Sequence, residues 1–164
     1  MNGSTKAAII GLGNILFKDE GFGVHLVRYL MNHYRFPVNC QVIDGGCAGL
    51  SLLDLMRGND LVFIIDVYLS QEDPPGSYKI FSWNDIENLK GNNFASVHQF
   101  GVKDALGVAR LQGIVPEVFK TYAVVPENMD LGLELSPTLA KVLPLLAEKV
   151  VSDLTNYNFK IEKV

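Results

Sequence analysis

Short apolar runs typical of strands recur along the chain. Residues 6–10 form such a run, which stops at Gly11-Leu12-Gly13-Asn14 and predicts a buried strand followed by a tight loop. Residues 61–65 are apolar at every position and end at Asp66, as expected for a central parallel strand covered on both faces. Further strands are predicted at residues 38–44, at residues 77–81, where polar and apolar positions alternate as in an edge strand, and at residues 118–125.

Between these runs, apolar residues repeat at helical intervals. One stripe predicts an amphipathic helix ending near residue 33 and consists of Gly23, Leu26, Val27, Leu30 and Met31. Shorter helices are predicted over residues 50–56 and from residue 102 until Gly113. Ser136 is a predicted N-cap followed by Pro137 at the first helical position, and this last helix is expected to kink at Pro144.

The alternation of strands and helices predicts the fold class. Parallel strands need crossover helices, and such crossovers are almost always right-handed. We therefore expect a three-layer α/β/α sandwich with a mostly parallel, doubly wound sheet of about five strands, formed by a single domain over residues 1–164. Only the strand at residues 77–81 need be antiparallel, and residues 156–164 are expected to form a loosely held tail.

Composition narrows the classes of function. The 164 residues are 48% hydrophobic and 20% charged, which favours a packed globule over a disordered chain. A net charge of −4 disfavours binding to nucleic acid or anionic lipid. The longest apolar stretches fall far short of the roughly 18 residues of a membrane span, and we expect a cytoplasmic protein in which Cys40 and Cys47 are thiols.

Three polar residues are candidates for a metal site. In a doubly wound sheet, ligands bind beyond the carboxyl ends of the strands, where the strand order reverses. Glu20 lies at the start of the first helix, Asp66 at the end of the apolar strand, and His98 in a polar loop. Two carboxylates and an imidazole suit a divalent transition metal with open positions. Alternatively, Glu20 is a first-turn acid, Asp66 an N-cap and His98 a capping or solvent-facing residue.

Two other interpretations compete with the metal site. Gly11-x-Gly13 after a strand is similar to a dinucleotide fingerprint, with Asp44 as the ribose-binding acid, but the third glycine is replaced by Leu16. Cys47 stands in a strand-to-helix turn, where thiolates are often activated, and His98 would serve as its base. A small buried thiol is the commoner role for such a cysteine.

Taken in order, several motifs resemble one family. They are Gly11-Leu12-Gly13-Asn14-Ile15-Leu16, Asp19-Glu20-Gly21-Phe22-Gly23-Val24, Asp44-Gly45-Gly46-Cys47-Ala48-Gly49-Leu50, the strand ending at Asp66, His98-Gln99, Pro126-Glu127 and Leu135-Ser136-Pro137. Their order and spacing are similar to those of the [NiFe]-hydrogenase maturation endopeptidases across nearly the whole chain. This chain departs from the family at Cys47, where a hydroxyl residue is frequent, and at Ala123, where glycine is frequent.

The resemblance implies an activity, a partner and a set of ligands. Members clip a short C-terminal extension from the precursor of the hydrogenase large subunit after nickel insertion, and the nickel itself is the recognition element. The implied metal ligands are Glu20, Asp66 and His98. Nickel would arrive with the substrate, and other divalent metals would substitute for it. The partner implied is the large-subunit precursor, with no nucleic acid and no membrane insertion.

The sequence leaves the chemistry and two alternatives open. The attacking water is polarised by the metal or activated by a carboxylate, with Glu20, Asp66 and His98 as catalytic candidates. Asp44 is a further candidate that would orient water or support the ligands, and its plainer role is to cap the next helix. The alternatives are a nickel-independent peptidase similar to the germination proteases and a hydrogenase assembly chaperone without catalysis.

Overall fold

The central sheet has five strands in the order β3-β1-β4-β6-β5. The computed structural model describes residues 3–90 and 101–164. The strands are β1 (Ala7–Leu12), β3 (Cys40–Gly46), β4 (Leu61–Val67), β5 (Tyr78–Phe81) and β6 (Val118–Val124). All neighbours pair in parallel except β5, which runs antiparallel to β6 at the edge of the sheet. The predicted mostly parallel, doubly wound sheet is therefore confirmed.

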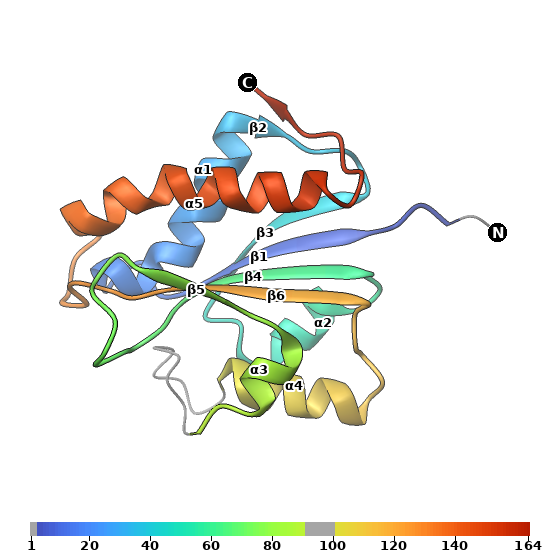
Figure 1. Cartoon of the computed structure of the whole chain (residues 1–164), viewed down its shortest axis with the longest axis horizontal. Coiled ribbons are helices and arrows are strands. Elements are labelled where there is room, and N and C mark those ends of the chain that lie inside the picture. The colour runs from blue at the N-terminus through green and yellow to red at the C-terminus, as the bar shows by residue number, and fades with distance from the viewer. Residues whose placement is uncertain (1–2, 91–100) are drawn as a thin grey trace.

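Helices cover both faces of this sheet (Figure 1). The helices α1 (Phe22–His33) and α5 (Pro137–Thr155) pack on one face. The other face is covered by α2 (Leu52–Met56), α3 (Trp83–Glu87) and α4 (Val102–Leu111). Two short 3-10 helices, η1 (Lys18–Gly21) and η2 (Gly49–Ser51), precede α1 and α2. The three layers are those of the predicted α/β/α sandwich.

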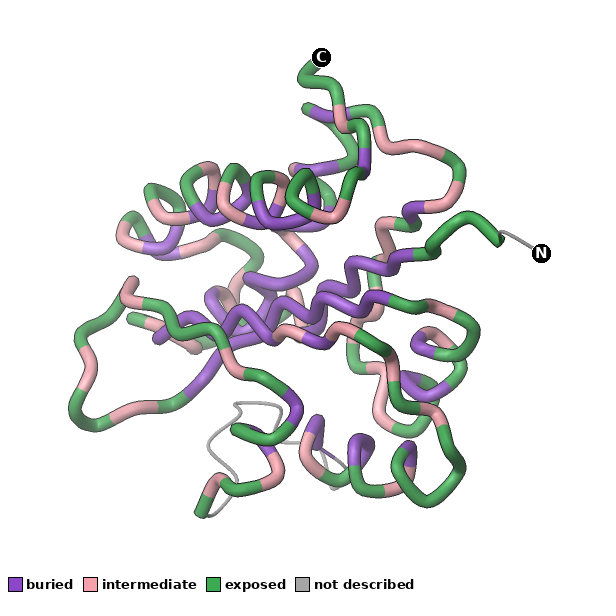
Figure 2. Tube along the Cα trace, turned by 45° about the vertical axis from the view of Figure 1, so that its right-hand side comes forward, coloured by how far each residue is buried: buried purple, intermediate pink, exposed green. Residues whose placement is uncertain are grey.

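The hydrophobic core is divided between the two faces of the sheet. One cluster joins α1 and α5 to side chains such as Ile9, Phe63 and Tyr122, and the other joins α2, α3 and α4 to Ile10 and Ile64. Strands β1 and β4 are buried along their whole length, as Figure 2 shows for the central strands.

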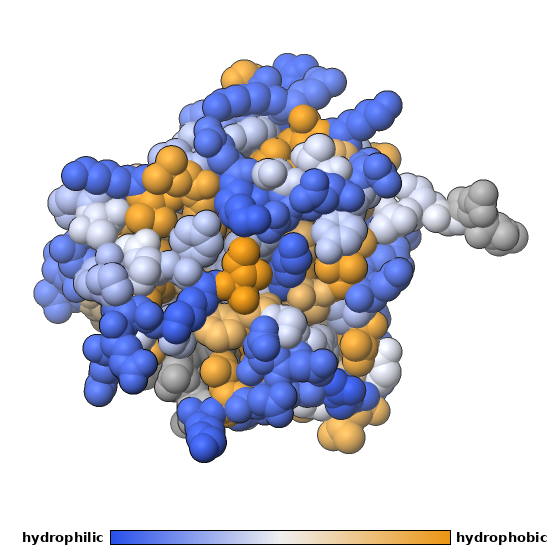
Figure 3. Space-filling view, viewed as in Figure 1, coloured by the Kyte–Doolittle hydropathy of each residue, from blue (hydrophilic) through white to orange (hydrophobic). Residues whose placement is uncertain are grey.

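On the face seen in Figure 3, hydrophilic residues cover most of the surface and apolar patches lie between them.

The last residues of the chain are held more firmly than the sequence predicts. Strand β7 (Glu162–Lys163) pairs with β2 (Tyr34–Arg35), which follows α1 directly. The backbone N–H of Val164 donates a hydrogen bond to the carbonyl of His33 at 2.8 Å, and Phe159 is buried in the core. The prediction of a loosely held tail over residues 156–164 is therefore wrong, because a single buried aromatic ring and a short ladder fix the segment.

Local signals explain two details of the helices. Helix α3 was not predicted, although Ser82 and Asp85 form a capping box at its start. Helix α5 begins at the predicted N-cap, where the Ser136 hydroxyl accepts a hydrogen bond from the N–H of Leu139, and it continues through Pro144. Pro144 has no N–H to donate to the carbonyl of Ala140, and Ala140 is an exposed residue.

Among the described residues, no helix has the length and apolarity to cross a membrane.

Close backbone contacts place the start of α1 directly on the sheet. A Cβ atom built on Gly23 would lie 2.3 Å from the carbonyl oxygens of both Leu12 and Ile65. A Cβ atom built on Gly11 would lie 2.1 Å from the carbonyl oxygen of Gly23. Because any side chain at these positions would displace backbone atoms, glycine is required where β1, β4 and α1 meet.

Substitution of Gly23 tests this contact. We expect Gly23→Ala to lower the free energy of unfolding by at least about 2 kcal/mol, because the added methyl group overlaps two carbonyl oxygens. The control is Gly107→Ala in α4, where the new methyl group meets no atom of the described residues within 4 Å and should stabilise the helix by about 0.5–1 kcal/mol. Urea unfolding measures both variants, and a Gly23→Ala protein as stable as the wild type would contradict the contact.

Candidate functional site

The candidate site lies where the strand order reverses. From β1 the chain crosses to β3 on one side and then returns to β4 on the other, so the carboxyl ends of β1 and β4 flank the crevice. The loops after β1, β4 and β6 gather at this end of the molecule, on the left in Figure 1. A Cβ atom on Gly13 would lie 1.9 Å from the carbonyl oxygen of Glu20. Glycine at position 13 therefore lets the loop fold back and bring Glu20 to the strand ends.

Asp66 is a buried carboxyl at the end of β4. Its side chain is 1% exposed, and Oδ1 accepts a hydrogen bond from the N–H of Val67 at 2.7 Å. Within the part of the chain that the structure describes, Oδ2 has no hydrogen-bond partner. Burial raises the pKa of Asp66 to about 7, with a further rise from the charge of Glu20 and an opposing effect of the Val67 N–H. A buried oxygen of this kind favours a bound cation or a proton.

Glu20 is the second carboxylate at this point. It belongs to η1 and is 8% exposed, and its charge is near enough to raise the pKa of Asp66. The predicted third ligand, His98, lies outside the described residues. Within residues 3–90 and 101–164, no three His, Cys, Asp or Glu side chains are arranged to hold a metal ion. The metal roles of Glu20, Asp66 and His98 therefore stay predictions.

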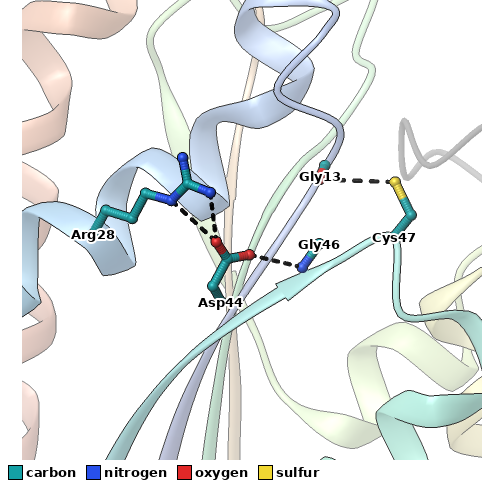
Figure 4. Close-up of polar contacts among 5 residues, drawn as sticks. All are labelled: Gly13, Arg28, Asp44, Gly46 and Cys47. Carbon is teal, nitrogen blue, oxygen red and sulfur yellow. Dashed lines mark hydrogen bonds and ion pairs between the residues drawn. The ribbon is translucent and has the colours of Figure 1, made fainter.

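Cys47 borders the two carboxylates without the features of an activated nucleophile. Cys47 is exposed as a residue, and its partly buried thiol points to the carbonyl of Gly13, with the sulfur 3.9 Å from the oxygen (Figure 4). Burial raises the pKa of Cys47, and the negative charges of Glu20 and Asp66 raise it further. A reactive cysteine needs the opposite environment, one that lowers its pKa. The electrostatics therefore disfavour the nucleophile interpretation.

Asp44 is engaged with a cation from α1. Its Oδ2 accepts hydrogen bonds from Arg28 Nε at 3.0 Å and Nη2 at 2.8 Å, and its Oδ1 accepts one from the N–H of Gly46 at 3.1 Å (Figure 4). No side chain of the described residues caps the helices η2 and α2 that follow, so the plainer role predicted for Asp44 is wrong. The pair is half exposed and within reach of water at the end of β3. Its role in orienting water stays a prediction.

Asp19 is a structural residue of the site that the sequence analysis did not assign. The side chain is fully buried, and its carboxylate accepts three backbone hydrogen bonds. Oδ2 accepts from the N–H groups of Glu127 and Asn128, at 2.9 and 2.8 Å, and Oδ1 accepts from the N–H of Ser136 at 2.7 Å. Asp19 thus holds both ends of the loop between β6 and α5 next to Glu20. The sequence signal that could have identified Asp19 is its position next to the candidate ligand Glu20.

A hollow beyond the carboxyl ends of β4 and β6 has the size to receive a peptide segment. It is lined by residues 68–72 and 125–126, which follow β4 and β6, and its volume is about 600 Å³. Tyr68 is only two residues beyond Asp66 along the chain. As the described residues form it, the lining of the hollow starts at Tyr68, just beyond the end of β4, and does not include Asp66.

Comparison with known proteins places this arrangement in a class of peptidases. A family model described as hydrogenase maturation protease matches residues 24–153. The hydrogenase 2 maturation protease of Escherichia coli is 33% identical over 149 residues, which cover 91% of this chain and 90% of that protein. The hydrogenase expression/formation protein HoxM of Azotobacter vinelandii is 34% identical over 152 residues, covering 87% and 73%.

Solved structures agree with these relatives. The hydrogenase maturating endopeptidase HybD from Escherichia coli has a TM-score of 0.86 and 29% identity, covering 97% of this chain and 98% of that protein. The maturation protease HybD from Thermococcus kodakarensis has a TM-score of 0.72 and 25% identity, covering 92% and 99%. The fold and its relatives thus define an α/β endopeptidase. The chain belongs to the hydrogenase maturation protease family.

The pKa of Asp66 predicts a pH-dependent stability. Because its pKa is about 7 in the folded protein and 3.8 ordinarily, the folded state holds a proton that the unfolded state loses between these values. The contribution of Asp66 to stability therefore falls as the pH rises from about 4 to 7, by at most about 1.4 kcal/mol per pH unit. We expect Asp66→Asn to match the wild type near pH 4 and to be the more stable protein at pH 8. Thermal unfolding across this pH range measures the difference. If the unfolding temperatures of the two proteins changed equally with pH, the raised pKa of Asp66 would be contradicted.

Asp19 predicts a separate effect on stability. Asp19→Asn replaces one accepting oxygen by an NH₂ group that faces backbone N–H donors. We expect a loss of about 2 kcal/mol or more in the free energy of unfolding, because buried donors are left without an acceptor. Asp130→Asn, in the same loop but exposed, is the matched control and should change stability by less than about 0.5 kcal/mol. If Asp19→Asn were as stable in denaturant as the wild type, the stabilising role of these three hydrogen bonds would be ruled out.

Proposed function

We propose that this chain is the endopeptidase that removes the C-terminal extension of the [NiFe]-hydrogenase large-subunit precursor after nickel insertion. Family membership supports the class of reaction and the class of substrate. The observation that carries the proposal is the buried Oδ2 atom of Asp66, which has no hydrogen-bond partner among the described residues and lies within electrostatic reach of Glu20. Two such carboxylates suit a cation delivered by the substrate.

Nickel is part of the substrate in this proposal. Carboxylate oxygens and an imidazole are suitable ligands for nickel, and other divalent metals would bind the same donors. Glu20 and Asp66 would hold the ion from the ends of η1 and β4, with His98 as the predicted third ligand. Ionisation of Asp66 would be favoured by the cation, which reverses the effect of burial on its pKa. A precursor without nickel would lack this attraction, so the site would bind the precursor productively only after nickel insertion.

The chain's own residues position the peptide and the water. The hollow at residues 68–72 and 125–126 would receive the segment around the scissile bond while the bound nickel fixes its register. Water would then add to the carbonyl carbon, the C–N bond would break, and the leaving amine would take up a proton that the water gives. The water would be polarised by the metal or activated by a carboxylate, and Asp44, held by Arg28, is the residue proposed to orient it.

Processing of the purified precursor tests this function. Nickel-loaded and nickel-free precursor are incubated with the protein, and the product is weighed by mass spectrometry. We expect loss of a C-terminal peptide only from the nickel-loaded form. Glu20→Gln, Asp66→Asn and His98→Ala should each slow processing by about 100-fold. Glu117→Gln, an exposed acid before β6 at the opposite end of the sheet, is the control and should process at the wild-type rate.

Other outcomes would assign a different function. Cleavage that does not depend on nickel would identify a peptidase similar to the germination proteases. Binding of the precursor without any change in its mass would identify an assembly chaperone. Wild-type rates in all three ligand variants would show that the site lies elsewhere.

A further inference from the structure

Four large apolar side chains stand out from the surface beside the candidate site. We call this surface the leucine patch, and it consists of Leu16 (51% exposed), Phe17 (38%), Leu131 (77%) and Leu133 (63%). They come from two segments far apart in the sequence, the loop after β1 and the loop between β6 and α5. Both segments lie at the carboxyl end of the sheet (Figure 1).

Backbone hydrogen bonds join these two segments. The N–H of Lys18 donates to the carbonyl of Gly132 at 2.8 Å, and the N–H of Gly132 donates to the carbonyl of Leu16 at 2.8 Å. Phe17 and Gly132 form a parallel β-bridge between these bonds. This pairing sets Leu131 beside Leu16 and Leu133 beside Lys18 along the backbone.

The leucine patch is also held rigidly. The Asp19 carboxylate binds backbone N–H groups at residues 127–128 and at Ser136, so both ends of the loop meet at one anchor. A surface that is ordered before binding loses little conformational entropy when a partner arrives. The four side chains of the leucine patch belong to neither of the two cores on the faces of the sheet, so the packing of these cores does not explain them. Clustered exposed apolar residues of this kind mark interaction surfaces.

We propose that the leucine patch docks the folded body of the hydrogenase large-subunit precursor, an inference that rests on the proposed function. The leucines project from the surface and so suit a hollow on a folded partner. Phe17 precedes Glu20 by three residues, so their Cα atoms are at most about 11 Å apart. A partner seated on the patch is therefore held beside the carboxylates that would receive its nickel.

Charges around the patch indicate the chemistry of the partner. Glu127, Asp130 and Glu134 are exposed on the loop that carries the two leucines, and Lys18 is a nearby cation. The patch is thus an apolar centre with a mainly acidic border. A complementary surface on the precursor has apolar residues bordered by Lys and Arg, and opposite charges at such a border accelerate association at low salt.

Kinetics on the nickel-loaded precursor test the docking surface. The double variant Leu131→Ser/Leu133→Ser is expected to raise KM by about 10-fold or more and to leave kcat within about twofold, because binding is weakened and the carboxylates are untouched. The matched control is Leu111→Ser/Leu145→Ser, which removes leucines that are 88% and 66% exposed on α4 and α5. The control should keep both constants, and thermal unfolding verifies that both double variants are folded.

Separate measurements distinguish failure of docking from failure of the proposed function. If the wild type cleaves and the patch variant has an unchanged KM, the docking proposal is overturned and the function stands. If the wild type binds the precursor without cleaving it, the function fails, and loss of binding in the patch variant still supports docking. A wild type that sediments as a dimer, with a monomeric patch variant of unchanged KM, would make the patch a contact between copies and overturn the proposal.

The acidic border provides an independent variant. Glu134→Lys should slow association with the precursor by several-fold at low salt, and the difference from the wild type should shrink as salt is added. A rate that is unchanged at all salt concentrations would contradict the proposed basic border on the partner.

Discussion

The contact between the first turn of α1 and the backbones of β1 and β4 determines where everything else at the site lies. Gly11 and Gly23 let a helix and two strands touch without side chains between them. Because the helix starts so close to the strands, the short turn η1 before it is brought over their ends, and Glu20 is brought with it. The strand order then adds Asp66 from the neighbouring strand. The position of Glu20 thus depends on the missing Cβ atoms, and that of Asp66 depends on the strand order.

Asp66 shows how a site can oppose stability. A carboxyl that is 1% exposed, with an oxygen that lacks a partner among the described residues, makes folding less favourable at neutral pH than an apolar or amide residue would. The buried core on both faces of the sheet supplies the stability that tolerates this group. A cation that reaches Oδ2 would displace no hydrogen bond made by the described residues. Selection for stability alone would not retain such a residue.

Much of the fold follows from local patterns, whereas long-range polar contacts do not. The apolar run that ends at Asp66 predicted β4, and the strand-order rule placed Glu20 and Asp66 at the same crevice. The carboxylate of Asp19 accepts hydrogen bonds from residues more than 100 positions away in the sequence. The donors are backbone N–H groups, which have no signature in the sequence. Pairing of β7 with β2 was missed for the same reason, since a two-residue strand has no periodicity to detect. The role of His98 lies outside the described residues.

The clamp at Asp19 also has an evolutionary consequence. Asp19 accepts its hydrogen bonds from main-chain groups of the loop between β6 and α5, so the exposed side chains of that loop, such as Leu131 and Leu133, can vary without loss of these bonds. Substitutions there would change the shape and charge of the exposed surface while the buried carboxylates and the glycine contacts stay as they are. A duplicated gene could therefore change this exposed surface by point mutation with little loss of stability.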